Sequence, residues 1–201
     1  MIAHPPQGPL SVPSHLEIAF SKRHKVPSSI TASGSKDSLW LLDTQTILAP
    51  HVNLLRAGPP QLSIGTCTFP KKGSDIACVV HENGFTLEPR SKVSSDYIFP
   101  ASTGGNFVLS GSRHGLDVKD AAGGNVAHLD IFNETDSNKE VFQKGVFVFG
   151  DTGMALSDVE KEKVIFTALA IAEHYKQTNK AWWDSAGNAG FWSSLGPAGS
   201  M

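Results

Sequence analysis

Short runs of alternating apolar and polar residues, separated by turn residues, fill most of the chain between residues 15 and 150. Alternation with a period of two predicts strands that are buried on one face. The runs recur at a spacing of roughly ten residues, which is typical of an antiparallel sandwich or barrel. The stretch from Lys22 to Lys36, rich in serine and basic residues, is interpreted as irregular. The predicted strands are His15–Phe20, Leu39–Asp43, Gln61–Phe69, Ile76–His81, Gly84–Glu88, Asp96–Phe99, Asn106–Ser110, Gly115–Asp120, Asn125–Phe132 and Gly145–Phe149.

One segment near the C-terminus departs from this pattern and predicts a helix. The residues from Ser157 to Glu160 have the form of a capping box, which marks a helix N-terminus. The run from Val164 to Ala172 then has no polar stripe. A helix that is apolar on all sides must be enclosed on all sides, and in a small β protein the natural enclosure is the inside of a barrel. The sequence therefore predicts an all-β protein with one buried helix, a closed antiparallel β-barrel threaded by a hydrophobic C-terminal helix.

The chain divides into three predicted regions. Residues 1–14 are a proline-rich arm, residues 15–179 contain the barrel and its helix, and residues 180–201 are a tail rich in Trp, Gly and Ser. The N-terminus has neither the basic nor the apolar region of a signal peptide. The longest apolar stretch is far shorter than the roughly 20 residues that cross a membrane. We therefore expect a cytoplasmic protein without a membrane span.

A hairpin turn at Gly123-Gly124 sets a testable strand register. A two-residue loop there sets Val118 opposite Leu129, so that apolar residues face each other as a one-sided hairpin requires. The same register sets Asp117 opposite Asp130, which is a mildly unfavourable pair.

Two further turns are expected at Lys72-Gly73 and Gly104-Gly105. A turn centred on Lys72-Gly73 sets Cys67 directly opposite Cys78. Such a pair can form a cross-strand disulfide or remain two free thiols in the core of a protein from a reducing compartment.

Composition removes several classes of protein. The chain has 17 Lys and Arg against 19 Asp and Glu, a formal net charge of −2. We therefore expect no nucleic-acid partner, because general nucleic-acid affinity depends on neutralised phosphates. Apolar residues make up 40% of the chain, too many for a disordered protein. Two cysteines without clustered histidines do not make a disulfide scaffold or a zinc site, and we expect no metal and no cofactor.

Four segments point to a known fold family: Ser38–Asp43, Gly115–Asp120, Val126–Leu129, and Val164–Leu169 with Glu173. With many short strands before one apolar helix, they resemble the tubby C-terminal-like fold, which tubby proteins, phospholipid scramblases and the plant LURP-one-related proteins share. They look most like a fungal branch of that group, and the resemblance covers roughly residues 15–177. It implies a closed barrel threaded by its helix. Tubby domains bind phosphoinositides through paired Lys and Arg on one barrel face, whereas the one dense basic cluster of this chain, at residues 22–25, does not align with that site.

Two sets of residues outside the strands are candidates for ligand binding. A short basic run is the only dense cationic cluster, and it either contacts anionic lipid or forms a solvated loop. The tail holds three of the four tryptophans, which prefer places with one apolar and one wet side. These tryptophans either form a lid or interface anchor, or pack across a barrel end and seal it. The ligand-binding candidates are Lys22, Arg23, Lys25, Trp182, Trp183 and Trp192.

The predicted hairpin around Gly123-Gly124 also contains the candidates for catalysis. They are His114, Asp117, His128 and Asp130, because a histidine beside a carboxylate can perform acid–base chemistry. The register places Asp117, His128 and Asp130 on a common face opposite the apolar residues, so they form either a solvated surface or a cleft under a covering loop or the tail.

Two functions follow from these observations. The first is a non-catalytic binding or adaptor module of tubby-like type, which recognises a lipid headgroup, a hydrophobic small molecule or a protein partner. The alternative is a small biosynthetic enzyme of cyclase or isomerase type, with an apolar pocket at a barrel end and His/Asp acid–base residues. A binding module predicts a barrel filled by its helix, whereas an enzyme predicts an apolar pocket with convergent His, Asp or Arg.

Overall fold

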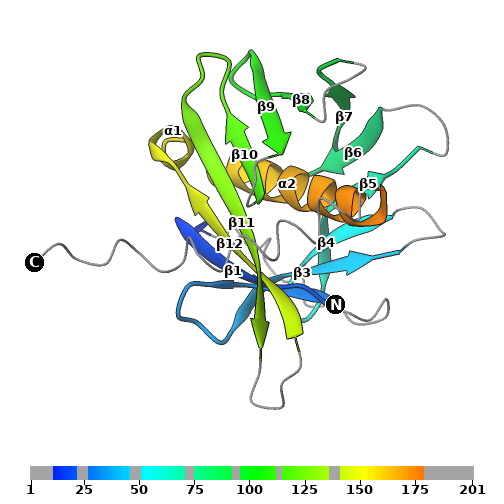
Figure 1. Ribbon diagram of the computed structural model, residues 1–201, viewed down its shortest axis with the longest axis vertical. Helices are drawn as coiled ribbons and strands as arrows, with labels where there is room; N and C mark the ends of the chain where they lie inside the picture. Colours follow the sequence, from blue (N-terminus) through cyan, green and yellow to red (C-terminus); the bar gives the residue numbers. More distant parts are fainter. Residues whose placement is uncertain are drawn as a thin grey trace, which may run out of the picture.

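Twelve antiparallel strands form a closed barrel (Figure 1). The computed structural model describes residues 11–21, 27–45, 51–70, 75–91, 96–111, 115–135 and 141–178. The strands are β1 (His15–Ala19), β2 (Ser28–Ala32), β3 (Ser38–Thr44), β4 (Val52–Arg56), β5 (Leu62–Thr68), β6 (Ile76–Val80), β7 (Asn83–Pro89), β8 (Tyr97–Pro100), β9 (Asn106–Gly111), β10 (Gly115–Lys119), β11 (Asn125–Thr135) and β12 (Val141–Phe149). Each strand pairs with its neighbours in sequence, and β1 also pairs with β12 to close the ring.

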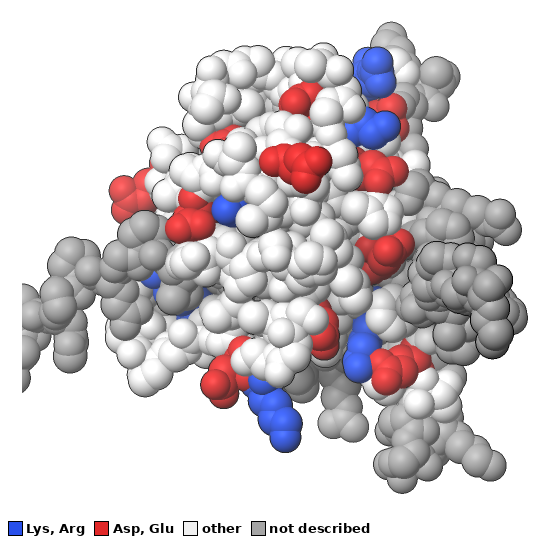
Figure 2. Space-filling model, turned by 90° about the vertical axis from the view of Figure 1, so that its left-hand side faces the viewer, with Lys and Arg blue, Asp and Glu red and all other residues white. Residues whose placement is uncertain are grey.

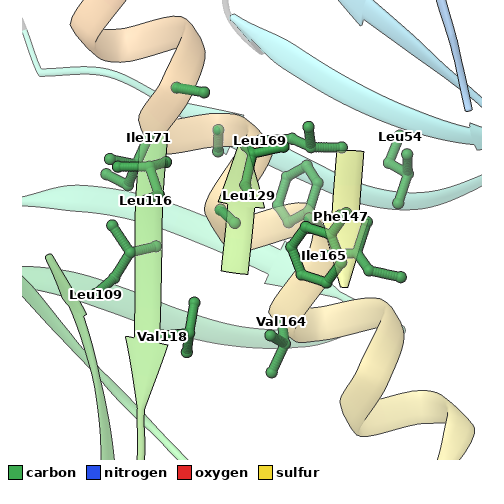
Figure 3. Close-up of a cluster of buried hydrophobic side chains, with 14 of the residues drawn as sticks. Leu54, Leu109, Leu116, Val118, Leu129, Phe147, Val164, Ile165, Leu169 and Ile171 are labelled. Atoms are coloured by element: carbon green, nitrogen blue, oxygen red, sulfur yellow. The ribbon is translucent and has the colours of Figure 1, made fainter. Parts of the chain in front are cut away.

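The helix α2 (Asp158–Thr178) runs through the inside of this barrel, as Figure 1 shows. An eight-stranded barrel is just wide enough for its own inward side chains to fill it, so a twelve-stranded one needs further atoms in its centre. In Figure 3, Ile165 and Leu169 of α2 lie among inward side chains of the strands, such as Phe147. The predicted fold class, a closed antiparallel β-barrel with an enclosed C-terminal helix, is confirmed.

The helix begins where the capping box predicts. The Glu160 N–H donates to Ser157 Oγ at 3.3 Å. The carboxylate of Glu160 accepts hydrogen bonds from the N–H and the hydroxyl of Ser102. This side chain therefore ties the start of α2 to the loop between β8 and β9. A one-turn helix that the sequence did not predict, α1 (Asp151–Met154), lies between β12 and α2.

Two strands were missed by the sequence pattern. β2 lies inside the stretch from Lys22 to Lys36, so its interpretation as wholly irregular is wrong; Ser28 and Ile30 point inward there and are buried. In β4 buried and partly buried positions alternate, and the buried, inward residues are Val52, Leu54 and Arg56. A charged residue at an inward position breaks the apolar alternation that predicts a strand.

The predicted register of the β10–β11 hairpin is wrong by two residues. Leu116, rather than Val118, lies opposite Leu129, and Asp117 lies opposite His128 rather than Asp130. The turn spans Asp120 to Gly124, because Asp120 Oδ1 accepts hydrogen bonds from the N–H groups of Ala122 and Gly124. An even shift leaves each side chain on its predicted face.

The turn predicted at Gly104-Gly105 is confirmed. The loop from Ala101 to Gly105 closes with an Ala101 N–H to Gly105 carbonyl hydrogen bond of 3.1 Å, and both of its glycines have positive φ. Residues 71–74 lie outside the described residues, but Cys67 lies directly opposite Cys78 as predicted. Both are buried free thiols, and a hydrogen bond to Cys78, with burial second, raises the pKa of Cys67.

Candidate functional site

Most of the candidate residues from the sequence lie outside the described part of the chain. Their roles stay predictions. They are His114, Lys22, Arg23, Lys25, Trp182, Trp183 and Trp192.

The other three candidates meet on the outer face of β10 and β11. His128 Nδ1 donates to Asp117 Oδ1 at 2.6 Å, and His128 Nε2 donates to Asp130 Oδ1 at 2.8 Å. All three side chains are about one-third exposed. The hydrogen bond to Asp130, and then charge attraction and the bond to Asp117, raise the pKa of His128 to about 9 against an opposing effect of burial. The imidazole is therefore held as a cation between two carboxylates.

This arrangement stabilises the β10–β11 hairpin and does not favour acid–base catalysis. Both ring nitrogens of His128 are occupied by carboxylates, whereas a general base needs a nitrogen that reaches the substrate. A catalytic role for Asp117, His128 and Asp130 stays a prediction. The described residues also contain no group of three His, Cys, Asp or Glu side chains placed to hold a metal ion.

The stabilisation from His128 has an expected pH dependence. Its folded pKa of about 9 lies above the ordinary value of 6.5, so the contribution is full below pH 6.5 and is lost as the pH rises through 9. After allowance for solvent screening we expect His128→Gln to lower the free energy of unfolding by about 1–2 kcal/mol at pH 6. At pH 10 the difference from wild type should be much smaller. Urea denaturation at both pH values measures it.

The control for this prediction is His15→Gln. His15 is exposed and its side chain is hydrogen-bonded to the neighbouring Ser14, so its substitution should cost little at either pH. A His128→Gln difference that stays constant or grows with pH would contradict the ion-pair interpretation.

A second cluster, which the sequence did not reveal, lies at one end of the barrel. Glu162 of α2 is fully buried and accepts three hydrogen bonds there, from Trp40, Arg56 and His81. Trp40 Nε1 donates to Oε1 at 3.0 Å, and Arg56 Nη2 reaches the same oxygen at 3.4 Å. His81 Nε2 donates to Oε2 at 2.6 Å. We call these four residues the Glu162 cluster.

Neighbouring elements bring the Glu162 cluster together. Trp40 of β3 lies directly opposite Arg56 at the end of β4, and His81 follows β6. The His81 N–H donates to the Ile64 carbonyl of β5 at 2.9 Å. Because the strands are antiparallel and consecutive, the end of β4, the start of β5 and the end of β6 share one barrel mouth.

The turn that presents His81 has an unusual backbone. His81 and Glu82 form the two-residue loop between β6 and β7, with φ values of 48° and 65°, as in a type I′ turn. Such turns favour Asn-Gly at their centre. This chain has Asn83-Gly84 directly after the loop but turns at His81-Glu82 instead. Positive φ at residues other than glycine is uncommon and clusters at functional sites.

An open pocket lies over the Glu162 cluster. It has a volume of about 460 Å³. Its apolar lining comes from β5 and from the exposed Val159 at the start of α2, and its polar lining includes Arg56 and His81. We call it the mouth pocket, and its lining residues are Arg56, Leu62, Ser63, Ile64, His81, Glu82 and Val159.

The guanidinium of Arg56 is buried but poorly satisfied. Only 8% of its side chain is exposed. Its one hydrogen bond within the described part of the chain is the 3.4 Å contact to Glu162, and its buried Nε has no partner there. A guanidinium offers five N–H donors, so Arg56 has donors left for a group that enters the mouth pocket.

One sequence signal for this site was present. Glu162 lies at the start of a helix that the apolar pattern predicts to be enclosed. A charged residue on an enclosed helix is almost never found unpaired, so a buried partner from a strand is required. The pattern does not say which of the chain's basic residues provides it.

The fold and the site together define a closed β-barrel with an enclosed helix and an open pocket at one mouth. Comparison with protein-family models, curated proteins and solved structures found no match. The resemblance to the tubby-like group therefore stays a prediction. None of the helices within the described residues has the length and apolarity of a membrane span.

Proposed function

We propose that the protein is a small-molecule-binding module of tubby-like type and that its ligand occupies the mouth pocket. The observation that supports this proposal best is the combination of a 460 Å³ pocket with exposed apolar walls and a buried, poorly satisfied arginine. Ligand sites are typically concavities of about 300–1,000 Å³ with mostly apolar walls and a few polar groups.

The barrel interior favours this position for the ligand. Side chains of α2 fill the centre, where residues such as Phe166 and Leu169 are fully buried. A ligand inside the barrel would have to displace the helix, whereas the mouth pocket is open.

A lipid headgroup or a protein remains the other possible partner of such a module. On the face shown in Figure 2, basic side chains are interspersed with acidic ones and do not form a continuous patch. Phosphate recognition rests on gathered Lys and Arg, so this face gives no support to a phosphoinositide surface.

A second candidate function is acid–base catalysis, now centred on His81. The 2.6 Å bond from Nε2 to Glu162 orients the imidazole. The other ring nitrogen has no hydrogen-bond partner within the described ranges, and the ring lines the mouth pocket. A histidine oriented by a carboxylate beside a pocket is the arrangement of a general base.

Filling the mouth pocket tests the binding proposal. Val159→Trp places an indole at the pocket wall and should weaken the binding of Nile red, an uncharged dye for apolar pockets, by about tenfold or more. The matched control is Val79→Trp, because Val79 is 42% exposed against 41% for Val159 and does not line the pocket. Fluorescence titration gives both affinities. Absent wild-type binding, or equal loss in the two variants, would contradict the proposal.

The same protein preparations separate binding from catalysis. A compound that co-purifies with the protein is identified by mass spectrometry, incubated with fresh protein and followed by NMR. An unchanged spectrum supports the binding module. A new spectrum that His81→Gln abolishes identifies an enzyme.

A further inference from the structure

We infer that the mouth pocket recognises an amphiphilic carboxylate, whose charged group binds Arg56 and whose aliphatic part covers the apolar wall. This inference rests on the proposed function and specifies the chemical class of its ligand. Three features support it: the unused donors of Arg56, the full engagement of Glu162, and the exposure of the wall.

Arg56 is the anion-binding group. A buried charge without full hydrogen bonding is unfavourable, and Arg56 has a single long contact and an unpartnered Nε within the described residues. Carboxylates match the planar fork of a guanidinium and make short, charge-assisted hydrogen bonds with it. A carboxylate in the mouth pocket would therefore accept hydrogen bonds from the terminal Nη groups of Arg56, whose one acceptor within the described residues is the distant Glu162 oxygen.

Glu162 neutralises the charge of Arg56 but does not saturate its hydrogen-bond donors. Oε1 already accepts from Trp40 Nε1, and Oε2 accepts from His81 Nε2. The carboxylate is thus held by β3 and by the turn after β6. Its distance of 3.4 Å from Arg56 Nη2 exceeds that of a good charge-assisted bond, about 2.7–2.9 Å. Glu162 is a positioning residue that keeps Arg56 in the mouth.

The apolar wall of the mouth pocket indicates that the ligand has an aliphatic part. Leu62 is 46% exposed and Val159 is 41% exposed, and both line the mouth pocket beside the buried Ile64. Two large exposed apolar side chains from different elements of one concavity form a surface that an alkyl chain can cover. The exposed Glu82 at the rim adds a negative charge that should weaken, but not prevent, carboxylate binding.

The probes are octanoate, octan-1-ol and acetate, each titrated by calorimetry into the full chain. Octanoate has both the charge and the chain, octanol has the chain alone, and acetate has the charge alone. We expect wild type to bind octanoate about tenfold or more tighter than octanol, with acetate weakest.

Three variants locate the charge recognition. Arg56→Lys keeps the charge but removes the fork, and should weaken octanoate about tenfold. The double variant Arg56→Met/Glu162→Met removes both buried charges, so that neither is left unpaired, and should bind octanoate and octanol equally. Glu82→Gln should bind octanoate at least as tightly as wild type. Circular dichroism verifies that each variant is folded.

The possible failures are distinguishable. Equal wild-type affinity for octanoate and octanol, no octanoate binding, or a preference that survives in the double variant would each overturn the inference. The proposed function is judged separately, by Nile red binding to wild type, Val79→Trp and Val159→Trp.

Discussion

Replacing Glu162 with leucine is expected to lower the free energy of unfolding by about 3–5 kcal/mol, because it leaves the buried Arg56 without a counter-charge. The indole N–H of Trp40 and Nε2 of His81 lose their acceptor in the same step. Urea denaturation followed by circular dichroism measures the loss.

Two variants show whether the charge pair is the cause. Arg56→Met/Glu162→Leu removes both charges and should recover most of the lost stability, since replacing a whole buried pair is often neutral. Glu134→Leu removes a carboxylate from an exposed ion pair with Lys144 and should cost at most about 1 kcal/mol. A double variant as unstable as Glu162→Leu alone would show that lost packing, rather than unpaired charge, explains the effect.

Replacing Phe166 with alanine is expected to cost about 3–5 kcal/mol, because it leaves a cavity at the centre of the barrel. Phe166 is fully buried and packs where β5 has a glycine; a Cβ on Gly65 would lie 3.2 Å from Phe166 Cδ1. The ring therefore occupies space that the strand leaves open. Chemical denaturation at neutral pH measures this loss.

The matched control lies on the same helix. Val159→Ala truncates an exposed residue of α2 and should change the stability by no more than about 0.5 kcal/mol. Similar losses in Phe166→Ala and Val159→Ala would contradict an enclosed helix.

The fold was predictable because its two signals are local. A strand that is buried on one face shows its alternation within its own four to eleven residues, and the helix shows its unbroken apolar run within one segment. Even the error in the β10–β11 register was even-numbered, so Leu116 and Leu129 remained inward. The side chain of Asp120 caused the error, because it extends the turn to five residues through hydrogen bonds that a count of glycines does not reveal.

The Glu162 cluster was not predictable because its members are distant in sequence and three of the four, Arg56, His81 and Glu162, each break a local rule. Arg56 points inward from a strand that apolar alternation misses, and Glu162 is a charge on a buried helix. His81 takes a turn position that favours asparagine or glycine. The Glu162 cluster explains all of these departures. It is visible only in the folded structure, because Arg56 and Glu162 are 106 residues apart in the sequence. The outer-face candidates Asp117, His128 and Asp130 were found because they lie on one hairpin.

The order of elements along the chain also has a consequence for synthesis. All twelve strands precede α2, so the strands of the barrel are synthesised before the helix that fills it. Until residues 158–178 emerge, the inward faces of the strands have no partner in the centre, and β1 waits for β12 to close the ring. The nascent chain thus exposes apolar strands for most of its translation, a period in which aggregation competes with folding and binding by chaperones is of most use.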